Sequence, residues 1–267
     1  MPPAERPIPQ QVQNYGREFL LGFSRQTPEQ ITQAMSLVWN EVFDVARLNI
    51  GPVVVSPCDR DAGEIEQLKA QGRMLIYVPQ QFTGIAGFGY LQQLFPRLFP
   101  AEFDPRVIRD TQEGEGQVGW LDVEFNTLTP HKGLSERQMR ETFRERNLRP
   151  QTLATYSIGR AISEVIFAGY NQGAGAHWED SRDDGCATLA TTFNIHEHDP
   201  HIIDRPLVVG TNFDTGGISI FSMPDEFGDP HLGARSAGKK QWSEQREQLQ
   251  TTGAAASAGR DSRTLPM

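Results

Sequence analysis

Apolar side chains recur at helical spacing in the N-terminal part of the chain. The first group predicts an amphipathic helix, because its members lie three or four positions apart: Val12, Tyr15, Phe19 and Phe23. A second helix begins at Thr27, where the run Thr-Pro-Glu-Gln supplies an N-cap, a first-turn proline and a capping-box glutamine. Its apolar positions continue to about Leu48, and Gly51 and Pro52 then end it.

Short apolar runs alternate with helical patterns in the next part of the chain. Residues 53–55 and 74–78 predict two strands, with a helix over 64–71 between them. This order is typical of a parallel β-α-β unit. The glycines at 84–89 lack the spacing of a dinucleotide-binding turn, and they predict a packed loop that leads to a short helix.

A strand is expected over residues 118–125, followed by two further helices. The second of these helices covers about 152–168 and is apolar along much of its length. The first begins with a capping box and a hydrophobic staple, formed by Leu134, Ser135, Gln138 and Met139.

Strand patterns dominate the last part of the chain. Residues 187–195, 206–213 and 217–221 predict strands, with a hairpin turn at 214–217. Because helices come early and strands come late, we expect an α+β fold with a helix-rich N-terminal part and a late antiparallel β-sheet.

One α+β domain is expected over residues 11–240. The polar turn at 113–116 leaves a division into two subdomains open. Residues 1–10 are rich in proline and predict a flexible arm. Residues 241–267 have almost no apolar side chains to bury, which predicts a flexible tail.

The 25 basic and 34 acidic side chains give a net charge of −9, which argues against a whole-chain attraction to nucleic acid or anionic lipid. No apolar run approaches the roughly 20 residues of a membrane span, and the N-terminus lacks the pattern of a signal peptide. Two cysteines are too few for a disulfide framework. We therefore expect a cytoplasmic protein whose partner is a small molecule or a protein. Its oligomeric state is left open.

The densest group of metal-ligating residues is the run His-Glu-His-Asp-Pro-His at 196–201. Alternate residues of a strand share one face, and imidazole suits zinc and other divalent metals. The run resembles the His-x-His-x-Asp-His signature of metallo-β-lactamase-like hydrolases, with aspartate at the fourth position instead of the fifth. This resemblance implies metal-dependent hydrolysis, in which His196, His198 and His201 would hold the metal and a bound water would supply hydroxide. A polar loop turned by Asp-Pro is the simpler interpretation.

Two further runs come near catalytic signatures. Residues 213–216, Phe-Asp-Thr-Gly, resemble the catalytic turn of aspartic proteases, but the chain has one copy and ordinary hairpin chemistry explains it. Residues 233–240 resemble a phosphate loop, but Lys240 stands where a magnesium-binding Ser or Thr is required. A looser anion site formed by Arg235, Lys239 and Lys240 stays open.

From about residue 118 to 238, a Leu-Thr-rich helix is followed by a Ser-Arg segment, strands and a terminal Pro-His…Leu-Gly…Ser pattern. This order resembles an uncharacterised bacterial family, and the resemblance implies a single intracellular domain without indicating an activity. The matching residues are Leu153, Ser181, Arg182, Pro230, His231, Leu232, Gly233 and Ser236.

The leading hypothesis is a ligand- or partner-binding module with a polar site in the C-terminal half. Polar and small residues gather there after a pair of strands, and loops of this kind commonly carry function. Metal-dependent hydrolysis, with zinc or another divalent metal, is the alternative, so whether the chain is an enzyme stays open. The candidate binding residues are Arg182, Asp214, His231, Arg235 and Ser236.

Overall fold

The computed structural model describes residues 8–20, 26–96, 108–110, 117–124, 131–171, 187–194, 205–211, 218–222, 232–234 and 236–239. The α-helices are α1 (Gln10–Leu20), α2 (Pro28–Leu37), α3 (Ala62–Ala70), α4 (Gly84–Leu94), α5 (Glu136–Glu145) and α6 (Leu153–Asn171). The strands are β1 (Arg73–Val78), β2 (Ile108–Asp110), β3 (Gly119–Glu124), β4 (Leu148–Pro150), β5 (Ala187–Asn194), β6 (Arg205–Thr211), β7 (Ile218–Ser222), β8 (Leu232–Ala234) and β9 (Ser236–Lys239).

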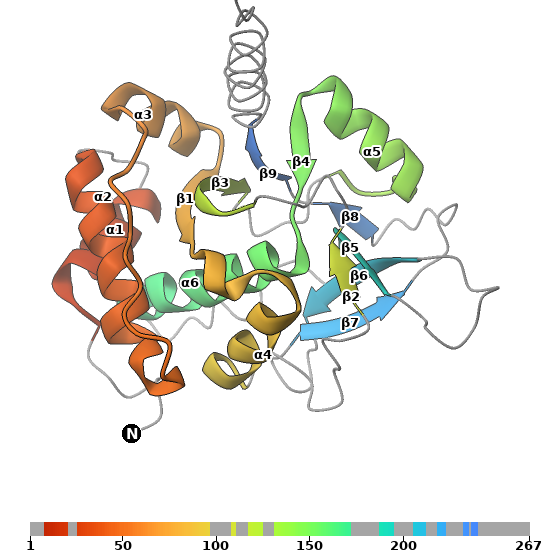
Figure 1. The fold of residues 1–267 in the computed structure, drawn as a ribbon. Coiled ribbons are helices and arrows are strands. Elements are labelled where there is room, and N and C mark those ends of the chain that lie inside the picture. Colours follow the sequence, from red (N-terminus) through yellow and green to blue (C-terminus); the bar gives the residue numbers. More distant parts are fainter. Residues whose placement is uncertain are drawn as a thin grey trace, which may run out of the picture.

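The strands form two sheets, and the fold is α+β (Figure 1). In the four-stranded sheet the order is β1-β3-β9-β4, and every neighbouring pair is antiparallel. The other sheet has the antiparallel order β2-β5-β6-β7, and β8 pairs with β5 in parallel. Residues 232–239 therefore supply one strand to each sheet, β8 to the second and β9 to the first.

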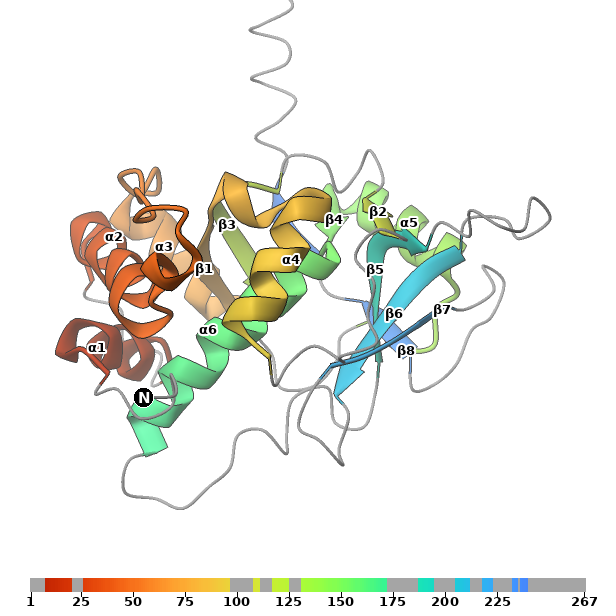
Figure 2. The same ribbon diagram turned by 60° about the horizontal axis from the view of Figure 1, so that its bottom comes forward.

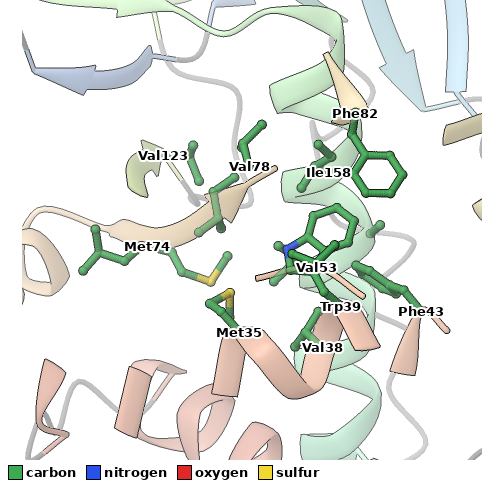
Figure 3. Close-up of a cluster of buried hydrophobic side chains, with 14 of the residues drawn as sticks. Met35, Val38, Trp39, Phe43, Val53, Met74, Val78, Phe82, Val123 and Ile158 are labelled. Carbon is green, nitrogen blue, oxygen red and sulfur yellow. The ribbon is translucent and has the colours of Figure 1, made fainter. Parts of the chain in front are cut away.

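The longest helix, α6, connects the parts of the molecule. It packs against α1, α4, β1 and β5, and it crosses the centre of the view in Figure 2. A hydrophobic cluster lies between the N-terminal helices, the four-stranded sheet and α6, and every member that Figure 3 labels is buried. The labelled residues are Met35, Val38, Trp39, Phe43, Val53, Met74, Val78, Phe82, Val123 and Ile158.

The predicted starts of two helices are confirmed. The side chain of Thr27 accepts a hydrogen bond from the backbone of Gln30, and Gln30 accepts one from the backbone of Thr27. Ser135 and Gln138 form the same reciprocal pair at the start of α5. The expected staple is present as well, since Leu134 packs against the cluster that contains buried Met139.

The predicted continuous helix to residue 48 is wrong in its second half. The α-helix ends at Leu37, and a π-helical turn at Val38–Val42 follows it. Asp44 then adopts a left-handed backbone conformation (φ 55°), which an α-helix does not accommodate, before a 3-10 turn at Val45–Leu48. Helical spacing of apolar residues persists through these changes, so periodicity alone does not reveal them.

The predicted parallel β-α-β unit at 53–78 is also wrong. Its first apolar run forms no strand, and β1 pairs with β3 in antiparallel orientation. Side chains hold the backbone of that run instead. Asn40 bonds both the amide and the carbonyl of Val53 (2.8 and 3.0 Å), and the Trp120 indole donates to the carbonyl of Ser56 (2.9 Å).

Helix side chains cover the outer edge of β1, the end strand of its sheet. The hydroxyl of Tyr15 donates to the carbonyl of Leu75 (2.6 Å), and the indole of Trp39 donates to the carbonyl of Tyr77 (2.9 Å). Burial raises the pKa of Tyr15, so the phenol stays protonated and remains a donor. Because these backbone carbonyls already accept hydrogen bonds, they are not available to pair with a strand of another chain.

The glycine-rich run at 84–89 belongs to a helix, where a packed loop was expected. Helix α4 begins at Gly84, directly after a 3-10 turn at Gln80–Phe82. That turn lies so close to α4 that position 87 has no space for a side chain. A Cβ at Gly87 would lie 2.6 Å from the backbone oxygen of Phe82. A Cβ at Gly89 would meet nothing within 4 Å.

These two glycines give a matched pair of substitutions in one helix. We expect Gly87→Ala to lower the free energy of unfolding by about 1–3 kcal/mol, because backbone atoms must move to admit the methyl group. Gly89→Ala is expected to raise it by up to about 1 kcal/mol, which is the difference in helix propensity. Urea unfolding followed by circular dichroism measures both. Equal effects would show that the turn at Phe82 does not constrain α4.

Candidate functional site

Ser236 lies among the described residues, and Lys239 of the looser anion site lies with it in β9. Within the part of the chain that the structure describes, no group of three or more His, Cys, Asp or Glu side chains could hold a metal ion. The other candidates lie outside the described residues: Arg182, His196, His198, His201, Asp214, His231 and Arg235.

Ser236 is fully buried at the start of β9, and its polar atoms bind neighbouring segments. Its amide donates to Oε2 of Glu124 (2.7 Å), its Oγ accepts from Nη1 of Arg73 (2.7 Å), and its carbonyl accepts from Nε2 of Gln151 (3.1 Å). The residue therefore joins β9 to β1, β3 and the start of α6.

Arg73 is the centre of this buried network. Its Nε donates to Oδ2 of Asp122 (2.5 Å) and its Nη2 donates to the Asp122 carbonyl (2.8 Å). Arg73 is 5% exposed and Asp122 is 2% exposed. The two residues lie on the neighbouring strands β1 and β3. Because the guanidinium of Arg73 is planar and has five N–H donors, it can bond a carboxylate, a carbonyl and a hydroxyl at the same time. We name Arg73, Asp122, Glu124 and Ser236 the buried network.

Glu124 lies at the edge of the buried network and faces His131. The imidazole Nε2 is 3.7 Å from Oε1 of Glu124, and Nη1 of Arg73 is 3.8 Å from the same oxygen. Burial raises the pKa of Glu124, but the His131 side chain, the Ser236 amide and the Arg73 charge outweigh burial. The pKa of Glu124 therefore lies below its ordinary value.

The His131 ring connects the buried network to α5. It meets the Phe143 ring edge-on at 5.0 Å. Phe143 and Met139 form a small apolar cluster with Ala234, and Leu134 and Leu148 pack against it. Ala234 belongs to β8, so the segment that contains the predicted residues His231, Arg235 and Ser236 includes a strand that packs against α5 (Figure 1).

The resemblance of residues 233–240 to a phosphate loop does not extend to the structure of the described ones, 233–234 and 236–239. A phosphate loop joins a strand to the N-terminus of a helix. Here residues 232–234 and 236–239 are two strands, and β9 pairs with β3 and β4. That backbone is engaged in sheet hydrogen bonds and does not form a phosphate cradle.

A basic segment that spans α5 and β4 was missed by the sequence analysis. Residues 131–150 contain six of the 25 basic side chains and three of the 34 acidic ones, which leaves 19 basic against 31 acidic elsewhere. The whole-chain net charge hides this local excess, and a charge count by segment would have found it. We name Arg137, Arg140, Arg144, Arg146 and Arg149 the arginine segment.

Arg149 is half-buried, as Arg140 is, whereas Arg137, Arg144 and Arg146 are exposed. Burial lowers the pKa of the Arg149 guanidinium, and no carboxylate among the described residues offsets that effect. Among the described residues its side chain makes no hydrogen bond or ion pair, and the same is true of the exposed Arg144 and Arg146. Arg137 does have a partner, since it lies 3.7 Å from Glu141 on the helix surface.

The backbone on both sides of Arg149 is fixed. Leu148 packs against the apolar cluster under α5. Pro150 is buried, and its carbonyl accepts a hydrogen bond from Nε2 of Gln117 (2.7 Å). Gln117 also accepts from the amide of Thr152 (3.1 Å) through its Oε1. The Arg149 side chain is therefore attached to a rigid element, as a preformed binding site requires.

Comparisons of the chain with protein-family models, with curated proteins and with solved structures find no match. The resemblance to a bacterial family over residues 118–238 therefore stays a prediction. Among the helices that the structure describes, none has both the length and the apolar character of a membrane span. The function must therefore be argued from the site itself.

The lowered pKa of Glu124 predicts how stability depends on pH. Because the folded-state pKa lies below the ordinary value of 4.5, Glu124 stabilises the fold above that pH. The contribution is lost as the pH falls through the folded-state pKa. We expect Glu124→Gln to be less stable than wild type at pH 7, and the difference to shrink below about pH 4. Urea unfolding at a series of pH values tests this; a constant difference would mean that the carboxylate charge is not the cause.

Proposed function

We propose that this protein is a non-enzymatic binding module with a polar site in its C-terminal half, at Arg149 on β4. One observation carries the proposal: Arg149 is half-buried on a fixed strand and has no counter-charge among the described residues. The ligand of such a site is an anion that carries carboxylate or phosphate oxygens.

The physical argument concerns the cost of removing a charge from water. A buried charge is ordinarily paired, because an unpaired one loses hydration without compensation. Arg73 follows this rule, since its donors bond Asp122 and Ser236. Arg149 has no such partner in the described part of the chain, and a ligand oxyanion would supply one. Guanidinium groups bind carboxylate and phosphate through two parallel hydrogen bonds, which gives both affinity and orientation.

The predicted binding residues near β8 and β9 are compatible with this location. His231 directly precedes β8, and Arg235 lies between β8 and β9 in the sequence. Ala234 packs beneath α5, so these residues belong to a segment that reaches the same helix. Arg182 and Asp214 remain candidates on the sequence argument alone. A cytoplasmic location and a small-molecule or protein partner complete the proposal.

Substitution of Arg149 tests the proposal with inorganic pyrophosphate and citrate as anionic probes. We expect both anions to raise the melting temperature of the wild-type protein, because a ligand that binds only the folded state stabilises it. Arg149→Gln should weaken binding about 10-fold, as expected for the loss of a charge-assisted hydrogen bond. Without ligand, this variant should be at least as stable as wild type, because an uncompensated charge has been removed.

Arg17→Gln is the matched control, since Arg17 is an exposed arginine on α1 that bonds Asn14. Helices α1 and α5 lie at opposite ends of the molecule in both views (Figures 1 and 2). Equal loss of anion binding in the two variants would mean that only overall charge matters. Such a result would contradict a site at Arg149.

Metal-dependent hydrolysis is the alternative function. The sequence observation that supports it is the histidine run at 196–201, which begins two residues after the end of β5. The proposal requires about one zinc or other divalent ion per chain, held by His196, His198 and His201. Elemental analysis of the purified protein, compared with His196→Ala/His198→Ala, measures this. A substoichiometric metal content that the double substitution leaves unchanged would exclude the hydrolase.

A further inference from the structure

We infer that Gln117 is a positioning residue for the anion site at Arg149, because it fixes the backbone from which that arginine projects. This inference rests on the proposed function and adds a second residue to its site. Three observations carry it: the irregular pairing of β4 at Arg149, the two hydrogen bonds from the Gln117 side chain to the backbone beyond it, and the burial of Gln117.

The side chain of Arg149 is directed away from α5. Successive side chains of a strand alternate between the two faces of the sheet, and Leu148 packs against the apolar cluster under α5. Arg149 therefore lies on the other face. In the ladder with β9 it lies opposite residues 237–238, and Ala237 belongs to the main hydrophobic core. The position of the guanidinium thus depends on the backbone of β4 and not on α5.

Pairing with β9 does not by itself fix the backbone at Arg149. Leu148 pairs with Lys239 and Pro150 pairs with Ser236, so one residue of β4 lies opposite two residues of β9. Such a bulge disrupts the ladder locally and leaves a residue without its regular hydrogen bonds. Pro150 has no amide hydrogen to donate, and β4 is the end strand of its sheet in the described part of the fold. The backbone at Arg149 therefore needs a further support.

The side chain of Gln117 supplies this support. Its Nε2 donates to the carbonyl of Pro150 (2.7 Å), and its Oε1 accepts from the amide of Thr152 (3.1 Å). Both ends of one amide side chain thus hold the segment that directly follows Arg149, where β4 ends and α6 is about to begin. Gln117 is 3% exposed, so little water competes for these two hydrogen bonds.

The effect of Gln117 on a ligand must act through Arg149. Gln117 is buried and its two polar groups are engaged with the backbone, so it is not itself a ligand contact. A guanidinium binds an oxyanion more tightly when its orientation is set in advance, because ordering a long side chain during binding lowers the affinity. Loss of the Gln117 hydrogen bonds should therefore weaken anion binding although the charge of Arg149 remains.

Asn40 provides a matched control, because its amide side chain also holds a backbone amide and a backbone carbonyl, those of Val53 (2.8 and 3.0 Å). Gln117→Met and Asn40→Leu keep the side-chain size and remove the hydrogen bonds, so both should lower the melting temperature. Isothermal titration calorimetry of the full chain with inorganic pyrophosphate measures affinity at a temperature where circular dichroism shows each variant to be folded. We expect Gln117→Met to weaken binding about 3–10-fold and Asn40→Leu to change it by less than about twofold.

A double substitution distinguishes positioning from general destabilisation. Because Gln117 acts only through Arg149, Gln117→Met/Arg149→Gln should bind pyrophosphate no more weakly than Arg149→Gln alone. Additive losses in the double variant, or equal losses for Gln117→Met and Asn40→Leu, would overturn the inference. If Gln117→Met does not fold, Gln117→Asn replaces it with the same expectation, since its amide is one methylene shorter and cannot reach both backbone groups.

The same titrations separate this inference from the proposed function. If Arg149→Gln weakens pyrophosphate binding but Gln117→Met leaves it unchanged, the inference fails while the proposed function stands. If Arg149→Gln binds pyrophosphate as tightly as wild type, both fail.

Discussion

The ion pair between Arg73 and Asp122 is the interaction on which the arrangement of the C-terminal strands depends. Both charges are removed from water, so each must be satisfied by the other and by hydrogen bonds. The guanidinium has more donors than one carboxylate can accept, and it binds Ser236 as well. Residues distant in the sequence are brought together in this way, because Arg73 and Ser236 lie on β1 and β9.

Several neighbouring elements depend on the position of β9. Its partners β3 and β4 lie on either side of it, and β8 joins the second sheet directly before it in the sequence. Ala234 of β8 supports the cluster that holds α5, and Leu148 of β4 packs against the same cluster. A satisfied charge in the core thus supports the elements that carry Arg149, whose charge has no partner among the described residues. The contrast between these two arginines, rather than the number of arginines, distinguishes a structural role from a proposed binding role.

Local signals predicted the elements well where a hydrogen bond within a few residues decides the structure. The capping boxes at Thr27 and Ser135 are examples. Asp61 and Glu64 form a third box that was not predicted, although the spacing is visible in the sequence. The run at Val53 gave a wrong strand because its backbone is held by side chains distant in the sequence, such as Asn40 and Trp120. β-Branched residues do not distinguish that arrangement from strand pairing.

The candidate site was predictable only in part. Ser236 was chosen because polar and small residues surround it, but local composition cannot show that Arg73, far earlier in the chain, bonds it in the core. The arginine segment needed only a local charge count. The half-burial of Arg149 with no counter-charge in the described part of the chain, by contrast, depends on tertiary packing and could not be predicted from the sequence. Seven of the eight predicted site residues lie outside the described residues, so those predictions stand as they were made.

The most direct test of this account compares two arginines that both pair with carboxylates. Arg73 bonds Asp122 in the core, whereas Arg137 pairs with Glu141 at 84% and 57% side-chain exposure. Urea unfolding of Arg73→Met should show a loss of about 3–5 kcal/mol, because Asp122 is left buried without its partner. Arg137→Met should change the free energy of unfolding by no more than about 0.5 kcal/mol. Similar small losses for both variants would contradict the claim that the buried network organises the fold.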